Sequence, residues 1–302
     1  MENIVQTVTT VNNAVNGFVW GMPMLIMLVG TGILMTILTR AFQLSRFGYW
    51  MKKTIGGIFT NKHITAHTAK DDRSISQFQS LCTALAATIG TGNISGVAAA
   101  IATGGPGSVF WMWIVAIFGM MTNYSENVLG IYYRRKNQDG EWCGGAMYYL
   151  KDGLGSYPGY KKIGSVLAVL FSCFCILASF GIGNMGQINS IAVNMTEAFH
   201  IPAWVTGVCL MAVAALVVLG GIKRIAAVTE KLVPFMALAY IVGAVVIAVM
   251  NASNIIPAFA IIFKCAFTGR AAFGGVVGAT VKDAVTWGMK RGVFSNEAGL
   301  GS

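Results

Sequence analysis

The sequence "ATIGTGNISGVAAA", residues 87–100, decides the fold class of this chain. Its glycine spacing is also found in turns that bind dinucleotides, but such a turn must follow a strand inside a soluble βαβ unit. The surrounding sequence does not provide that context, because residues 74–125 hold no Asp, Glu, Lys or Arg. A charge-free run of this length matches two membrane crossings of about 20 residues each. We therefore interpret the glycines as an interruption of an apolar helix at membrane depth.

The composition also indicates a membrane protein. The chain of 302 residues is 55% hydrophobic and only 11% charged, whereas soluble domains carry about 25% charged residues. The sequence predicts an all-α polytopic membrane protein with about seven membrane helices. The charge-free runs cover residues 3–39, 74–125, 163–196, 198–222 and 232–263.

The formal net charge of +10 could suggest a nucleic-acid partner, but the basic residues follow a different pattern. Residues 40–77 hold seven basic and two acidic residues, and residues 134–162 hold six basic and three acidic ones. The gaps at 104–107, 197–201 and 251–257 hold no Lys or Arg. In membrane proteins the loops on the cytoplasmic side carry an excess of lysine and arginine, and the external loops do not. We expect no nucleic-acid partner, a location in the cell membrane, and an N-terminus on the outside.

Two interrupted helices are expected at equivalent places of an inverted repeat. One covers residues 78–103 and breaks at 90–96; the other begins near residue 271 and breaks at Gly274, Gly275 and Gly278. The two helices would cross the membrane in opposite directions. This combination is a strong sequence indication of an inverted repeat whose binding site lies at the breaks.

The other elements are assigned around these two helices. We expect an extra N-terminal helix at 15–39, a first repeat at 78–251 and the start of a second repeat at 271–302. Inside the first repeat, residues 163–199 are expected to form one long helix, and residues 231–251 its last helix. The final "SNEAGLGS" is typical of a chain that continues, so we expect the rest of the second repeat to lie beyond Ser302.

A broken membrane helix exposes backbone groups, which are tolerated at that depth where they line a cavity or bind a ligand. The amides of Thr91, Gly92 and Asn93 begin the outer half-helix and suit a carboxylate, because a helix N-terminus is partly positive. The carbonyls that end the inner half-helix suit a sodium ion. Gly90 would let the backbone approach the ligand closely. The alternative is that these glycines only let helices pack together.

Polar side chains in the charge-free helices are further candidates. Asn93 could give an oxygen to an ion or a donor to the substrate. Gln187 either contacts the substrate or makes a hydrogen bond between helices, because a buried amide needs a partner. Asn184 and Asn189 fit the helix–helix role better. Glu126 either belongs to a proton or ion path or pairs at the cytoplasmic rim.

Several blocks of the chain, in order, resemble the alanine or glycine:cation symporter family, also called sodium:alanine symporters or amino-acid carrier proteins. These blocks are "LAATIGTGNISGVAAAIATGGPG" (85–107), "SVFWMWIVAIFGMMTNYSENVLGIYYR" (108–134), "GGAMYYLKDGLG" (144–155), "SFGIGNMGQINSIA" (179–192) and "RGVFSNEAGLGS" (291–302).

The resemblance implies sodium-coupled uptake of a small neutral amino acid, alanine or glycine, by alternating access. It also implies a leucine-transporter-type inverted-repeat fold preceded by one extra helix. The carbonyls of Ala86 and Ile89 join Asn93 as sodium ligands on this basis, and Gln187 is supported as a substrate contact. We also place Gly275, from the second break, among the substrate-binding residues.

Two other classes of function are compatible with parts of the sequence. An ion channel or another cation-coupled carrier is the alternative, although a glycine-rich selectivity filter usually needs a ring of subunits. An enzyme would need a convergent set of acid, base or metal-binding residues, which the sequence does not indicate. We expect sodium as the coupling ion and no other cofactor.

Overall fold

The computed structural model describes residues 2–61, 75–138, 140, 142–181, 184–268 and 280–301. Most of these residues are helical, which agrees with the expected all-α architecture. The described part of the chain also holds one short antiparallel strand pair, β1 (Arg135–Lys136) with β2 (Trp142–Cys143).

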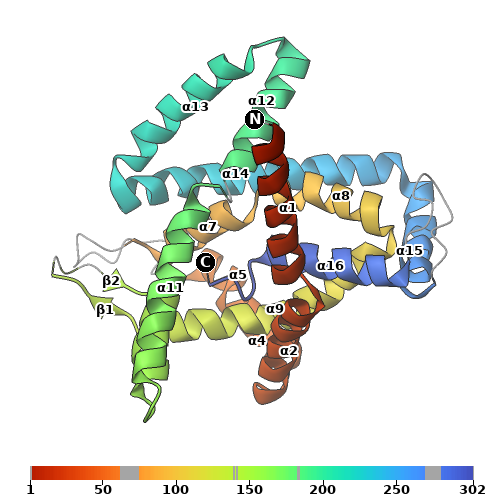
Figure 1. Cartoon of the computed structure of the whole chain (residues 1–302). Helices are drawn as coiled ribbons and strands as arrows, with labels where there is room; N and C mark the ends of the chain where they lie inside the picture. Colours follow the sequence, from red (N-terminus) through yellow and green to blue (C-terminus); the bar gives the residue numbers. More distant parts are fainter. Residues whose placement is uncertain are drawn as a thin grey trace. The chain divides into compact units, whose positions relative to one another are not determined.

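Figure 1 shows the helices in chain order. The first part of the chain forms α1 (Glu2–Val19), α2 (Met22–Leu38), α3 (Phe42–Ser45), α4 (Phe47–Lys53) and α5 (Ile55–Thr60). The middle part forms α7 (Gln77–Thr88), the 3-10 turn η1 (Thr91–Asn93), α8 (Ser95–Gly104), α9 (Gly107–Tyr132), α10 (Ala146–Tyr148), the π-helical turn η2 (Tyr149–Gly153) and η3 (Leu154–Ser156). The last part forms α11 (Lys161–Ser179), α12 (Met185–Phe199), α13 (Ala203–Val218), α14 (Gly221–Met250), α15 (Ala252–Phe267) and α16 (Val281–Asn296).

Within the described residues, four helical segments are long and apolar enough to cross a membrane. They are Val5–Leu38, which combines α1 and α2, then Gly107–Tyr132, Lys161–Ser179 and Gly221–Met250. The helix α7 passes the same test only together with η1 and α8, as a pair of helical segments bent at the break between them. The helices α13 and α15 are apolar but shorter. This helix content confirms a multi-pass membrane protein.

The N-terminal helix differs from the expected range of 15–39. Helical structure begins at Glu2 and divides into α1 and α2 at residues 20–21. Gly21 has an extended backbone with φ −75° and ψ 172°, and Pro23 lies in the first turn of α2. Proline has no backbone N–H, so it suits the first turn of a helix and disrupts a helix interior.

The expected single helix over 163–199 is wrong, because the structure forms two helices, α11 ending at Ser179 and α12 beginning at Met185. Asn184 lies immediately before α12. Its Oδ1 accepts a hydrogen bond from the Met185 N–H at 2.6 Å, and its Nδ2 donates to the Ser179 carbonyl at 2.9 Å. Asparagine is a preferred residue at a helix start because its side chain satisfies such unpaired backbone groups. The last helix of the expected repeat also begins earlier, at Gly221.

The described helices form two compact units. The first unit comprises Met1–Arg46, Ser95–Glu126 and Ser253–Ser302, and the second unit comprises Phe47–Ile94 and Asn127–Ala252. The boundary passes through the interrupted helix, so that α7 belongs to the second unit and α8 to the first.

In the second unit, polar side chains join α7 to α14. Gln79 Nε2 donates to Glu230 Oε2 at 2.8 Å, and the hydroxyls of Thr83 and Thr229 lie 3.1 Å apart. Gln79 also completes a reciprocal capping box with Ser76 at the start of α7, which satisfies two backbone donors there. Membrane helices gain little from apolar contact with one another, so such hydrogen bonds are a main means of joining them.

In the first unit, α9 and α16 approach closely through glycine. A Cβ built on Gly288 would stand 2.6 Å from the Ser108 carbonyl oxygen, and one on Gly292 would stand 3.2 Å from Val115. Trp111 on α9 donates from its indole N–H to the Ala266 carbonyl of α15 at 3.2 Å. Small residues permit this backbone approach, which increases dispersion contacts between membrane helices.

Candidate functional site

The backbone between α7 and η1 is the centre of the candidate site. The Ile89 N–H donates to Leu85, after which Ile89 and Gly90 are extended, with φ/ψ of −86°/103° and −144°/−169°. Among the described residues, the carbonyl oxygens of Ala86 and Ile89 accept no backbone hydrogen bond. The predicted break is therefore present. It leaves the carbonyl oxygens of Ala86 and Ile89, among others around the end of α7, without the backbone partners that a continuous helix would give them.

Asn93 provides a third oxygen at the break. Its side-chain Nδ2 donates to the Thr88 carbonyl at 2.9 Å, which fixes the orientation of the amide. Its Oδ1 is buried and accepts no hydrogen bond within the described part of the chain. A buried acceptor without a partner costs about 1–3 kcal/mol, and a bound cation would offset that cost.

Gln187 reaches the break from α12. A Cβ built on Gly90 would stand 2.8 Å from Gln187 Nε2 and 3.4 Å from its amide carbon, so the amide lies against the bare α-carbon of Gly90. Gln187 is the third residue of α12, and Asn184 sets where that helix begins. The side chain is half-buried. The structure thus brings Gly90 and Gln187 together from positions far apart in the sequence, inside the second unit.

The backbone amides of the break only partly match the expectation that they are placed to bind a carboxylate. The Asn93 N–H donates to the Gly90 carbonyl at 3.0 Å to form η1, so in this conformation it is not available to a carboxylate. Thr91 and Gly92 lie in the same turn. Gly275, the substrate-site candidate from the second break, lies outside the described residues, as do Gly274 and Gly278.

Arg291, on α16 in the first unit, was not among the residues predicted from the sequence. A Cβ built on Gly96, in the first turn of α8, would stand 1.6 Å from Arg291 Nη2. The guanidinium group of Arg291 thus occupies the space that a side chain at residue 96 would fill. A signal was present in the sequence, since an arginine near membrane helices seeks a specific partner.

Glu126 has a specific partner in the same unit. Its Oε2 accepts a hydrogen bond from the Gly299 N–H at 3.2 Å, which ties the turn after α16 to α9. Gly299 has a positive φ of 86°, a conformation that glycine adopts without strain. This contact gives Glu126 a third role, beside the two that the sequence suggested.

The fold and this site define an α-helical multi-pass membrane protein with an interrupted helix, an organisation found in ion-coupled transporters. The model of the sodium:alanine symporter family matches residues 5–302. The chain belongs to this family, as the resemblance implied.

Curated relatives are similar over almost the whole chain. The sodium/alanine symporter AgcS of Methanococcus maripaludis is 49% identical over 290 residues, which cover 96% of this chain and 60% of AgcS. The amino-acid carrier protein AlsT of Bacillus subtilis is 37% identical, with 96% of this chain and 57% of AlsT covered. The transporter YflA of Bacillus subtilis, which is uncharacterized, is 41% identical, with 95% and 58% covered. The chain therefore spans about three fifths of the length of these relatives.

Proposed function

We propose that the protein is a secondary active transporter that couples sodium to the uptake of a small neutral amino acid, alanine or glycine, by alternating access. Membership of the sodium:alanine symporter family supports this function. AgcS, 49% identical to this chain, bears the name of a sodium/alanine symporter. The observation that carries the proposal is the break after α7, where, among the described residues, the Ala86 and Ile89 carbonyls accept no backbone hydrogen bond and the Gln187 amide lies against Gly90.

The proposed sodium ligands are the carbonyl oxygens of Ala86 and Ile89 and the side-chain oxygen of Asn93. Sodium prefers oxygen ligands, and transporters of this kind take them from the carbonyl ends of broken helices. The unpaired Asn93 Oδ1 supports the assignment, because coordination of a cation would offset the cost of burying it.

The proposed substrate site lies beside the ion. The carboxylate of the amino acid would be held at the backbone of Thr91 and Gly92, near the positive end of the following half-helix. Gln187 would contact the amino or carboxylate group, and Gly90 would leave room for it. Gly275 would complete the site from the second break.

The fold we propose is a leucine-transporter-type inverted repeat in the cell membrane. Residues 78–251 would form the first five-helix repeat, 271–302 would begin the second, and the helix expected at 15–39 would precede both. The N-terminus would lie outside and the basic segments 40–77 and 134–162 inside, because lysine and arginine are retained on the cytoplasmic side.

The test is transport by the full-length protein in liposomes. We expect saturable uptake of labelled alanine or glycine that requires an inward sodium gradient and stops when potassium replaces sodium. A non-saturating current that is independent of amino acid would favour the channel alternative and contradict the proposal.

A further inference from the structure

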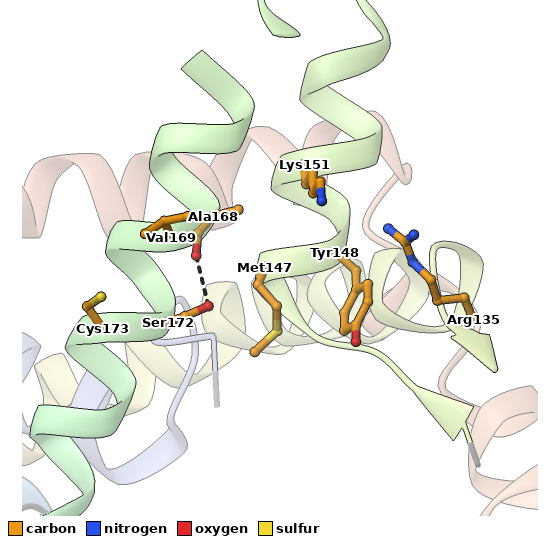
Figure 2. Close-up of a pocket in the computed structure, with 8 residues that line it drawn as sticks. All are labelled: Arg135, Met147, Tyr148, Lys151, Ala168, Val169, Ser172 and Cys173. Atoms are coloured by element: carbon orange, nitrogen blue, oxygen red, sulfur yellow. Dashed lines mark hydrogen bonds between the residues drawn. The ribbon is translucent and has the colours of Figure 1, made fainter. Parts of the chain in front are cut away.

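A cavity lies in the second unit, between α11 and the segment formed by α10 and η2. Its volume is about 440 Å³, within the range of about 300–1,000 Å³ that is usual for ligand sites. Figure 2 shows Met147 and Tyr148 between α11 on one side and Arg135 on the other. The cavity is lined by Arg135, Met147, Tyr148, Lys151, Ala168, Val169, Ser172 and Cys173.

The walls of this cavity are fixed by close packing. Gly164 on α11 lies so near η2 that a Cβ there would stand 2.5 Å from the Leu150 carbonyl oxygen. Gly153 in η2 likewise leaves room for the Tyr133 ring, whose nearest atom would be 3.0 Å from a Cβ. The approach of Gly164 to the Leu150 backbone therefore limits the separation between η2 and α11.

The cavity has a positively charged part. Arg135 lies over the Tyr148 ring at 5.0 Å and pairs with Asp152, which holds its guanidinium in place. Arg134 and Lys136, its neighbours in sequence, lie instead over the Trp142 ring. Alternate residues of a strand point to opposite faces, which accounts for this division.

Lys151 is the second cation of the cavity. It takes part in no ion pair among the described side chains, and the cavity lining found among the described residues includes no carboxylate. Although Asp152 occupies one side of Arg135, the arginine side chain is 50% exposed and keeps further donors for an anion.

The opposite wall is apolar and belongs to a helix that can span the membrane. Ala168, Val169 and Cys173 lie on α11, and Ser172 Oγ is already engaged with the Ala168 carbonyl at 2.9 Å, the dashed line in Figure 2. These residues are about 10–18 Å along the helix from Lys161 at 1.5 Å per residue. A free phosphate would leave this apolar wall uncovered, whereas a phospholipid presents an anionic headgroup and an acyl chain together.

We propose that this cavity binds one anionic phospholipid, with its phosphate at Arg135 and Lys151 and its glycerol and upper acyl chain along Val169 and Cys173. Basic pockets beside membrane helices recognise anionic headgroups in this way. The site is separate from the break at Gly90 and does not depend on the proposed transport function.

Cys173 provides a local probe for this site, and Cys175 provides a matched control. Both thiols are exposed on α11, but only Cys173 lines the cavity. Two single-cysteine proteins, one keeping each thiol, would be alkylated with a maleimide in nonionic detergent. The alkylation rate would be measured with phosphatidylglycerol, phosphatidylcholine or inorganic phosphate added in separate reactions.

We expect phosphatidylglycerol to slow alkylation of Cys173 but not of Cys175, with little effect of the other two additions. Lys151→Gln should raise the phosphatidylglycerol concentration for half-protection about fivefold, and adding Arg135→Gln should raise it further. Lys162→Gln removes an exposed charge outside the cavity and should leave the phosphatidylglycerol concentration for half-protection unchanged. Lys151 is exposed, so its variant should fold normally.

Three results would overturn this proposal. The first is equal protection of Cys173 by phosphatidylglycerol and phosphatidylcholine, which would indicate non-specific lipid coverage. The second is equal protection by inorganic phosphate, which would indicate a site for a free anion. The third is protection that Lys151→Gln and Lys162→Gln weaken to the same degree.

Discussion

The side-chain amide of Gln187 lies against the α-carbon of Gly90, with Nε2 only 2.8 Å from the place where a Cβ would stand. Because α12 and the break after α7 meet at this point, one methyl group at residue 90 would displace the amide. The contact links two residues of the proposed substrate site, and it gives a sharp test of that site.

Gly90→Ala should reduce alanine uptake about 10- to 100-fold, because a small misplacement of a positioning group can have an effect of this size. Its extended backbone is accessible to alanine, so the change acts through space alone. The measurement is the initial uptake rate at several substrate concentrations. Gly186→Ala is the control on α12, since among the described residues nothing beyond its own helix backbone and chain neighbours lies within 4 Å of the added Cβ.

Combining Gly90→Ala with Gln187→Ala isolates the contact. If both changes act through the same amide, uptake by the double variant should be no lower than uptake by the less active of the two single variants. Independent, multiplying losses would show that Gly90 and Gln187 serve different purposes.

Asn93→Ala should raise the sodium concentration for half-maximal uptake about tenfold or more, because it removes the buried oxygen that we assign to the ion. Asn194→Ala is the control, since Asn194 is exposed and, among the described residues, its side chain bonds to Ser190 in its own helix. Sodium dependence that is unchanged in Asn93→Ala would remove Asn93 from the ion site.

Gly288→Ala should destabilise the first unit by about 1–3 kcal/mol, as is usual for overpacking. The added methyl group would stand 2.6 Å from a backbone oxygen of Ser108, which cannot move away as a flexible side chain could. Thermal unfolding in detergent would measure the effect. Gly30→Ala on α2 has open space around its Cβ and should unfold like the unmodified protein.

The proposed orientation can be tested with impermeant thiol reagents on intact cells, in a background without the natural cysteines. His200→Cys, near an external turn of the proposed topology, should be labelled. Thr60→Cys, in the segment proposed to be cytoplasmic, should be labelled only after the membrane is opened. The reverse pattern would invert the topology.

The break after α7 could be predicted from sequence because closely spaced glycines in a charge-free run weaken a continuous membrane helix. The division between α11 and α12 could not, since hydropathy does not register that Asn184 bonds to Ser179 and to the Met185 amide. Hydropathy also does not register the division between α1 and α2, because Gly21 and Pro23 lie in a segment that is uniformly apolar.

Contacts between residues that are distant in the sequence could not be predicted for this site. Gln187 was a candidate as a polar residue in an apolar helix, but nothing in the sequence indicated Gly90 as its neighbour. The approach of Arg291 to Gly96 could not be predicted from the sequence, because it depends on how α16 packs against α8 within the first unit. The amide of Asn93 was expected to be available, yet the 3-10 turn uses it locally.

We propose that sodium and a small amino acid bind together at the break after α7. The most direct measurement is the dissociation constant of alanine from the purified full-length protein at rising sodium concentration, with potassium keeping the ionic strength constant. We predict that sodium tightens alanine binding, that alanine tightens sodium binding by the same factor, and that Asn93→Ala abolishes both effects. Alanine binding that is independent of sodium in the unmodified protein would contradict the account.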